Sequence, residues 1–411
     1  MSAVAEQPPP APAAPSRDTV GAYARRWWID VKAGELGSLP IVVGLIVIAI
    51  VFQIQNDRFL TAGNFVNLIV QTAPYAVIAM GVTFALLLGE IDLSIGFVSG
   101  VGGVLVALLL NPDGNELPTA VAIALALGCG LGIGLLHGLI ITKVGVPSFV
   151  VTLAGLLAWN GVVLLLIGSR GTVILQNDFV IGLANDFMGE GVAWVMWAVC
   201  VALFAAVQLV RYRSRTKAGL ATDPMAIVAL RIGALAVALG LVVLIANEDR
   251  GIPYSGILVG ALLIGWTYVL NRTRFGRHVY AVGGNAEAAR RAGINVDRVK
   301  IACFMIVSVM AVLGGIILAS RLRSVDTNTG GGQALLYPIA AAVIGGTSLF
   351  GGRGTMKAAL LGALVMIGID NGLGLLGLSS GTKFVVTGGV LLLAVTVDSI
   401  SRRGRAHAGR A

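Results

Sequence analysis

A succession of long apolar runs, separated by short polar segments, is the feature that most constrains how this chain can fold. A helix needs roughly 20 apolar residues to cross the hydrocarbon of a bilayer. The bilayer interior holds no water for unpaired backbone groups, so such runs cross as helices. The sequence therefore predicts an all-α, polytopic membrane protein with ten to twelve transmembrane helices. The twelve candidate runs are residues 39–54, 65–88, 94–110, 118–142, 147–168, 192–210, 226–246, 253–271, 301–319, 335–350, 356–369 and 383–397.

Four of these runs, the first, third, tenth and eleventh, are short for a full crossing. We expect tilted, broken or re-entrant segments there, because non-helical backbone is tolerated at membrane depth where it lines a polar cavity or is buried in protein. Glycines recur within the runs, as at positions 128, 130, 132, 134 and 138. Small residues at this spacing let two helix backbones approach closely in lipid.

Composition and charge exclude a soluble protein that binds nucleic acid. Only 12% of the residues are charged and 57% are hydrophobic, so charged side chains could not cover a globule. The net charge of +9 comes from bases between apolar runs, where they set membrane orientation. With the N-terminus inside, 22 Lys and Arg residues fall in inside segments and 6 in outside segments, leaving out Arg231 within a run. This predicts that both termini are cytosolic.

The chain divides into a membrane domain and two tails. Residues 1–16 are rich in Pro and Ala, a composition that predicts a disordered cytosolic tail. Residues 17–38 place two tryptophans beside paired arginines, which favours an interfacial juxtamembrane segment over a plain linker. No apolar stretch precedes Leu39, so we expect no cleavable signal peptide. The transmembrane domain covers residues 39–398, and residues 399–411 form a basic cytosolic tail.

Catalytic and cofactor motifs are missing from the sequence. No GxxxxGK[ST], HExxH, GxSxG or Cys/His cluster occurs, so we expect no enzyme activity, no cofactor and no metal site. If ATP powers this protein, the motor is another chain. The three cysteines, Cys129, Cys200 and Cys303, fall in apolar runs without CxxC spacing and are expected to be packing residues.

The longest polar island in the middle of the chain covers residues 272–300. Within it, Asn285 can cap a short helix, Glu287 lies in the favourable first turn, and two arginines occupy the last turn. Gly293 then supplies the left-handed turn that ends the helix. Because a helix of about two turns is marginal alone in water, we interpret it as a docking element for a cytosolic partner. A capped surface loop is the alternative.

Two acidic residues, Glu90 and Asp92, lie where one apolar run ends and the next begins, in the stretch 89–96. Ionisable groups at membrane depth are costly and face a bundle interior or a polar cavity. In one interpretation the backbone breaks here and the acids, with Ser94, line or shape a translocation route. In the other, the stretch is a short cytosolic hairpin whose acids are solvated or cap the next helix.

A weak internal echo favours the first interpretation. Residues 345–352, which include Thr347 and Ser348, share with residues 89–96 a glycine at both ends and a leucine at the fifth place. An internal duplication, with two breaks facing each other, would produce this pattern. Asp370 and Asn371 form a third polar spot, at the end of a run.

Four motifs together resemble the membrane-spanning permease of bacterial ABC importers for monosaccharides, the ribose/xylose/galactose branch. They are GEIDLSIG, VPSFVVTLAGLLAWNG, FGRHVYAVGGNAEAARRAGINVDRVK and AAAVIGGTSLFGGRGT, and the similarity extends over residues 64–399. Within the branch, the sequences VTLAGLLAWNG and LLAVTVDS are most similar to D-xylose permeases. The chain departs from many relatives at His137, where they carry Asn.

The resemblance implies a division of roles along the chain. The island becomes a coupling loop that docks on an ATPase subunit through Asn285, Glu287, Ala288, Ala289, Arg290, Arg291, Gly293 and Ile294. The glycine-flanked stretches match motifs near the pore, without assigning sugar contacts to individual side chains. Our translocation-pathway candidates are Glu90, Asp92, Ser94, Thr347, Ser348, Asp370 and Asn371.

The resemblance also implies partners. Two permease copies would form the pore in the bacterial inner membrane, two ABC ATPase subunits would bind the cytosolic face, and a periplasmic sugar-binding protein would deliver a pentose such as D-xylose. Ribose, galactose or another monosaccharide is the alternative cargo. From another class, an ion-coupled secondary transporter would use Glu90, Asp92 or Asp370 to bind a proton or Na⁺. A membrane-embedded prenyl transferase would need DxxxD motifs, which the sequence does not contain.

Overall fold

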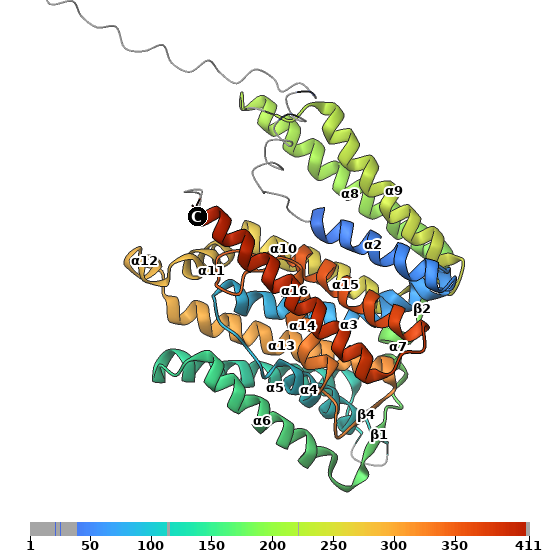
Figure 1. The fold of residues 1–411 in the computed structure, drawn as a ribbon, viewed down its shortest axis with the longest axis vertical. Helices are drawn as coiled ribbons and strands as arrows, with labels where there is room; N and C mark the ends of the chain where they lie inside the picture. Colours follow the sequence, from blue (N-terminus) through green and yellow to red (C-terminus); the bar gives the residue numbers. More distant parts are fainter. Residues whose placement is uncertain (1–20, 22–24, 26–38, 113–115, 221, 408–411) are drawn as a thin grey trace, which may run out of the picture. The chain divides into compact units, whose positions relative to one another are not determined.

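The computed structural model describes residues 21, 25, 39–112, 116–220 and 222–407 (Figure 1). Each of the twelve predicted runs coincides with a helix in this part of the chain. These helices are α2 (Leu39–Gln55), α3 (Ala62–Leu87), α4 (Ile95–Leu109), α5 (Thr119–Leu139), α6 (Ser148–Ile167), α8 (Glu190–Lys217), α9 (Met225–Asn247), α10 (Tyr254–Arg272), α13 (Val296–Leu322), α14 (Gln333–Ile344), α15 (Met356–Leu375) and α16 (Ser380–His407).

Shorter elements connect these helices. Three are the α-helices α7 (Asp178–Asn185), α11 (Arg274–Gly284) and α12 (Ala286–Arg291), and two are single turns, η1 (Ile140–Val144) and η2 (Gly168–Arg170). The described strands form two small antiparallel pairs. They are β1 (Thr172–Ile174) with β4 (Ser324–Asp326), and β2 (Phe187–Met188) with β3 (Ile252–Pro253).

Eight described helices are long and apolar enough to cross a membrane: α3, α5, α6, α8, α9, α10, α13 and α15. The helices α2, α4 and α14 are apolar but have only 17, 15 and 12 residues, as expected for the first, third and tenth runs. The eleventh run was predicted to be short, and this is wrong, because α15 has 20 residues. The predicted polytopic helical membrane protein is confirmed.

The predicted tails are only partly described. Residues 1–16 and 408–411, and nearly all of residues 17–38, lie outside the described residues. The last helix, α16, continues to His407, so its backbone extends beyond the predicted boundary at residue 398 into the basic segment.

The helix α13 is central to the larger structural unit, residues 38–188 and 246–411. It packs against α3, α4 and α5, while α14 and α15 pack against α3 on another side (Figure 1). Sixteen residues of α13 and eighteen of α3 are buried. A helix that is apolar all round belongs in a protein interior or in lipid, so these two helices form the centre around which the shorter, interrupted helices are arranged.

The smaller unit contains α8 and most of α9, within residues 189–245. The indole Nε1 of Trp197 in α8 donates a hydrogen bond of 2.9 Å to the carbonyl oxygen of Ala236 in α9. Large apolar side chains of both helices, such as Leu203 and Val237, are exposed. Exposed apolar side chains over two long helices are what a lipid-facing hairpin requires.

Glycines of α5 face α13 in alternation with glycines that face away. A Cβ added at Gly134 would overlap the carbonyl oxygen of Phe304, and one added at Gly130 would lie 2.7 Å from Cγ2 of Val312. At Gly128 and Gly132 a Cβ would meet nothing within 4 Å. Close helix contact in lipid therefore depends on only part of the predicted glycine series.

We expect Gly134→Ala to lower the stability of the purified protein by about 1–3 kcal/mol, because the added methyl overpacks the α5–α13 contact. Gly132→Ala is the matched control in the same helix and should be neutral or stabilising, since Ala is the better helix former by up to about 1 kcal/mol. Thermal unfolding in detergent measures both. Equal midpoints for the two variants would contradict this account of the packing.

Candidate functional site

The short helix α12 is closed at both ends by its own sequence. The Asn285 side-chain oxygen accepts a hydrogen bond of 2.9 Å from the backbone N–H of Ala288. At the other end, Gly293 has a positive φ of 83°, and the N–H of Ile294 donates to the carbonyl oxygen of Ala289 at 3.0 Å. This is the Schellman arrangement, in which a left-handed glycine satisfies the last carbonyls. The predicted cap and stop residues therefore act as the sequence indicates.

The two faces of α12 differ in character. The Glu287 carboxylate pairs with the guanidinium groups of Arg290 at 2.9 Å and Arg291 at 3.1 Å, and all three side chains are more than half exposed. Ala289 is only 5% exposed and packs into the protein's own core, with Ile294 half-buried beside it. We expected Ala289 on the docking surface. The structure instead places this apolar residue on the inner face, where its burial holds the helix.

The segment before α12 lies against both breaks in the membrane domain. A Cβ on Gly283, at the end of α11, would overlap the carbonyl oxygen of Leu87, the last residue of α3. The same Leu87 oxygen accepts a hydrogen bond of 2.8 Å from the N–H of Gly352. The Tyr280 hydroxyl donates to the carbonyl oxygen of Gly354 at 2.8 Å. The ends of α3 and α11 and the loop 345–355 thus meet at one place, here called the junction.

The hydrogen bond from Tyr280 persists over the physiological pH range. This side chain is partly buried, and burial raises the pKa of its phenol above the ordinary value. The hydroxyl therefore remains protonated and can donate to Gly354 at neutral pH.

The first break, residues 88–94, is held by its two acids. Glu90 forms an ion pair with Lys300 in the first turns of α13, and both side chains are largely buried. The Asp92 Oδ1 accepts hydrogen bonds from the N–H of Ser94 at 2.9 Å and from its Oγ at 2.6 Å. Asp92 is 4% exposed. The acids are therefore not solvated, and Asp92 orders the backbone that enters α4, as in the alternative in which the acids cap the next helix.

The second break, residues 345–355, is a glycine-rich loop with buried hydroxyls. Thr347 and Ser348 are buried, and the Ser348 Oγ accepts a hydrogen bond from the N–H of Phe350 at 3.1 Å. A Cβ on Gly351 would lie 3.0 Å from the backbone nitrogen of Gly89 in the first break. The two breaks lie against each other, as the internal echo predicted.

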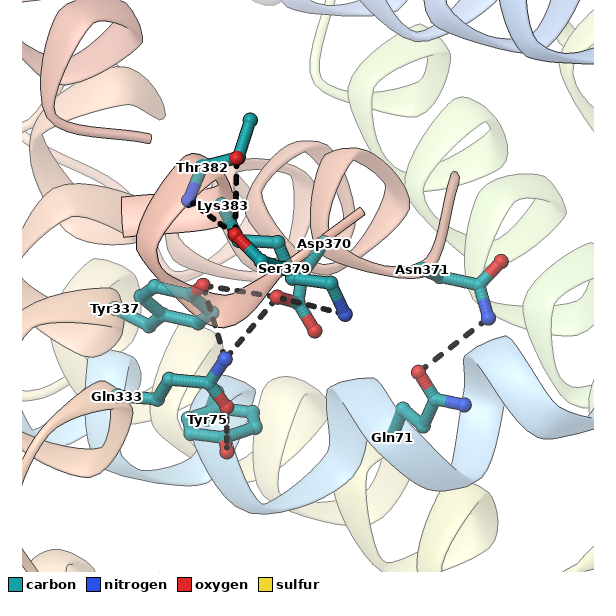
Figure 2. A network of polar contacts seen from close by, with 9 residues as sticks. All are labelled: Gln71, Tyr75, Gln333, Tyr337, Asp370, Asn371, Ser379, Thr382 and Lys383. Atoms are coloured by element: carbon teal, nitrogen blue, oxygen red, sulfur yellow. Dashed lines mark hydrogen bonds and ion pairs between the residues drawn. The ribbon is translucent and has the colours of Figure 1, made fainter. Parts of the chain in front are cut away.

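Asp370 belongs to a separate polar cluster between α3, α14, α15 and α16 (Figure 2). Its Oδ1 accepts hydrogen bonds of 3.1 Å from the Tyr337 hydroxyl and from the Gln333 amide, and lies 3.9 Å from the Lys383 ammonium. The Tyr75 hydroxyl donates to the Gln333 amide oxygen at 3.4 Å. We call these five residues the Asp370 cluster.

Asn371 points away from the Asp370 cluster. Its amide exchanges two hydrogen bonds of 3.0 Å with the amide of Asn64, which is also buried, and approaches Gln71 at 3.5 Å (Figure 2). We predicted that Asp370 and Asn371 mark the end of a span, and this is wrong. Both side chains form hydrogen bonds with residues of neighbouring helices, and α15 continues past them to Leu375.

Comparison with known proteins identifies the family. Residues 64–395 match the family described as branched-chain amino acid transport system / permease component. The chain belongs to this family of permeases. The resemblance drawn from its motifs is confirmed.

Individual relatives cover nearly the whole chain. The xylose transport system permease protein of Escherichia coli K12 is 34% identical over 90% of this permease and 94% of its own length. The corresponding protein of Haemophilus influenzae is 33% identical over 89% and 98%. The ribose import permease protein of E. coli K12 is 31% identical over 92% and 96%. No solved structure matches.

Several residues that build these two sites escaped sequence reasoning. They are Tyr280 and Lys300 at the junction, and Gln333, Tyr337 and Lys383 in the Asp370 cluster. Gln333 and Tyr337 are four apart on one helix and therefore share a face, which was a usable signal. Within the part of the permease that the structure describes, no group of three His, Cys, Asp or Glu side chains could hold a metal ion.

We expect Gly283→Ala to open the junction, because its methyl group cannot coexist with the Leu87 carbonyl. Amide hydrogen exchange should accelerate about tenfold or more in residues 280–294, which corresponds to a local loss of at least about 1.4 kcal/mol. Gly284→Ala is the control, since a Cβ there meets nothing within 4 Å. If both variants exchange like the wild type, Gly283 does not fasten the junction.

Proposed function

We propose that this permease is the membrane-spanning subunit of an ATP-driven importer that carries a pentose such as D-xylose. Its relatives are permeases of xylose and ribose transport. The single observation that supports the mechanism is the position of α12. A charged, double-capped helix follows directly on the segment that contacts both breaks of the membrane domain.

The mechanism starts from force applied at α12. The helix presents Glu287, Arg290 and Arg291 to a partner, and its inner face carries Ala289. Displacement of α12 would pull on α11 and the junction before it, and on α13 after it. Packed side chains and backbone contacts transmit such shifts because cores are dense and resist continuous deformation. The two breaks would then reorient α4 and α15 and open or close the route.

The ion pair between Glu90 and Lys300 strengthens this link. It joins the first break directly to the beginning of α13, and both side chains are largely buried. Removal of one partner from a buried pair leaves an uncompensated charge, which costs about 3–5 kcal/mol. The pair therefore favours concerted movement of the break and α13.

The proposed function requires three kinds of partner: ATPase subunits, a binding protein and a second permease copy. The permease sequence contains no P-loop, so ATP hydrolysis belongs to separate ABC ATPase subunits that receive α12. A periplasmic binding protein delivers the sugar, and a second permease copy completes the pore in the bacterial inner membrane. The charge distribution supports cytosolic termini and a cytosolic α12.

Xylose is favoured over other monosaccharides by a small margin. The xylose permeases reach 33–34% identity, and the ribose permeases of E. coli and Bacillus subtilis reach 31% and 33%. Selection by the binding protein would leave the permease little to discriminate, so ribose and other monosaccharides are the alternative cargo.

An ion-coupled transporter fits the structure less well. Such a protein needs an acid that is available to a proton or Na⁺ inside the bundle. Here Glu90 is paired with Lys300, the Asp92 Oδ1 accepts two hydrogen bonds from Ser94, and Asp370 lies beside Lys383. Glu90 and Asp370 thus each lie beside a cation already, which disfavours capture of a second cation, whereas Asp92 keeps one oxygen without a hydrogen-bond partner.

Charge reversal on α12 tests the proposed coupling. We expect Glu287→Arg to reduce uptake of D-xylose at least tenfold in cells or vesicles that contain the ATPase and the binding protein. The variant loses both ion pairs of Glu287 and places three positive charges, at positions 287, 290 and 291, on one face of α12. The permease itself should insert and remain folded, because all three side chains are exposed.

Asp178→Arg is the control for this prediction. It reverses an exposed acid in the first turn of α7, which packs near the far end of α13 through Ser320. It should leave uptake unchanged. Normal uptake in Glu287→Arg, with the ATPase still bound, would rule out α12 as the docking element.

A further inference from the structure

The Asp370 cluster has the chemistry of a site for a polyhydroxylated solute. It combines one carboxylate, one amide, two phenolic hydroxyls and one ammonium group from four helices (Figure 2). We propose that this cluster binds hydroxyl groups of the sugar as it passes, at the end of the bundle opposite the junction. The proposal rests on the proposed function, because it assumes that a sugar is the cargo.

Three helices place the cluster far from the junction. In α3, Tyr75 lies 12 residues before Leu87, which at 1.5 Å per residue is about 18 Å along the helix. In α15, Asp370 lies 14 residues after Met356, or about 21 Å. In α14, Gln333 lies 11 residues before the helix ends at the second break, or about 17 Å. The three distances agree, so the cluster lies roughly 20 Å from the junction along the helix axes and forms a separate polar layer of the bundle.

The hydrogen-bonding capacity of the cluster is only partly used. The contacts of the Asp370 carboxylate with Tyr337, Gln333 and Lys383 all involve Oδ1, and within the described residues its Oδ2 has no hydrogen-bond partner. An ionised carboxylate can accept from about four directions. Sugar hydroxyls donate and accept, so they can use the free carboxylate oxygen together with the Gln333 amide and the Tyr337 hydroxyl. The side chain of Asp370 is 17% exposed, so this oxygen can be reached.

The existing contacts are long, which makes them easy to exchange. The hydroxyl of Tyr337 lies 3.1 Å and that of Tyr75 3.4 Å from their acceptors, whereas O–H···O bonds centre near 2.7–2.8 Å. The ammonium of Lys383 lies 3.9 Å from the carboxylate, beyond the roughly 2.7–2.9 Å of a charge-assisted hydrogen bond. A passing hydroxyl can therefore replace these contacts at small cost.

Lys383 argues against a cation site at the same place. Its ammonium is the nearest cation to Asp370, and Gly374 leaves it room, since a Cβ there would lie 3.0 Å from Nζ. A bound metal cation would have to displace it. A neutral polyol needs only to share the carboxylate.

The competing explanation is a helix tie, that is, a set of polar contacts that only holds helices together. The Asn64–Asn371 pair provides the comparison. That pair also joins α3 to α15, but its two amides satisfy each other with bonds of 3.0 Å in both directions and are buried. It leaves little capacity for a ligand. The Asp370 cluster differs in its unused acceptor and its exposure.

The experiment uses the whole importer, with ATPase and binding protein, in proteoliposomes supplied with D-xylose. For Asp370→Asn we expect uptake at saturating binding protein to fall at least tenfold, while ATP hydrolysis stimulated by the binding protein and the thermal midpoint stay close to wild type. The ratio of sugar imported to ATP hydrolysed therefore falls. Tyr337→Phe, which keeps the ring and removes one hydroxyl, should lower the same ratio by a smaller factor.

Asn64→Ala is the matched control. It should lower the thermal midpoint while uptake and ATP hydrolysis per folded importer keep their wild-type ratio. The proposal is overturned if Asp370→Asn and Tyr337→Phe keep the wild-type ratio, or if they lose stability, hydrolysis and uptake in proportion as a helix tie would. Failure of the wild-type importer to carry D-xylose or any other monosaccharide with its ATPase would instead overturn the proposed function.

Discussion

The backbone of a broken helix must satisfy its polar groups without water, and the junction shows how this permease does so. The carbonyl oxygen of Leu87, left unpaired where α3 ends, accepts from the N–H of Gly352 in the other break. Glycines make the contact possible, because a side chain at Gly283 would occupy the space of that carbonyl. The second break thus supplies the N–H donor and the end of α3 supplies the carbonyl acceptor. Each group would cost several kcal/mol if it were left unsatisfied in lipid.

This constraint explains why the acids of the first break are buried and not solvated. Asp92 orders the turn into α4 through both hydrogen-bonding groups of Ser94, and Glu90 reaches Lys300 on another helix. The break is therefore attached to α13, against which α3, α4 and α5 pack. A segment that is both interrupted and firmly attached can change orientation as a unit, which is what a hinge in a transport route requires.

Local features of the fold could be predicted from the sequence, and long-range ones could not. The caps of α12 and the interruptions after Leu87 and Ile344 follow from nearby residues and glycine placement. The full length of α15 and the partners of Asp370 depend on helices distant in sequence, whereas the inward face of Ala289 belongs to a helix that packs against its neighbours α11 and α13. Glu90 and Lys300, for example, are 210 positions apart. Asp370 and Asn371 were assigned to the end of a run because the sequence does not reveal their hydrogen-bond partners on other helices.

The same three helices carry both sites, and this would connect the proposed coupling with the proposed passage of sugar. The ends of α3, and the loop between α14 and α15, form the junction, while Tyr75, Gln333 and Asp370 on these helices form the cluster roughly 20 Å away. Helices transmit movement along their length, and Pro74 in α3 and Pro338 in α14 each remove one backbone hydrogen bond, so a bend in these two helices would occur near the cluster. A rotation that α12 imposes on the junction would therefore also separate Tyr75, Gln333 and Asp370. The long bonds of the cluster are the contacts that would yield first, and they would free their donors and acceptors at the moment when the route opens.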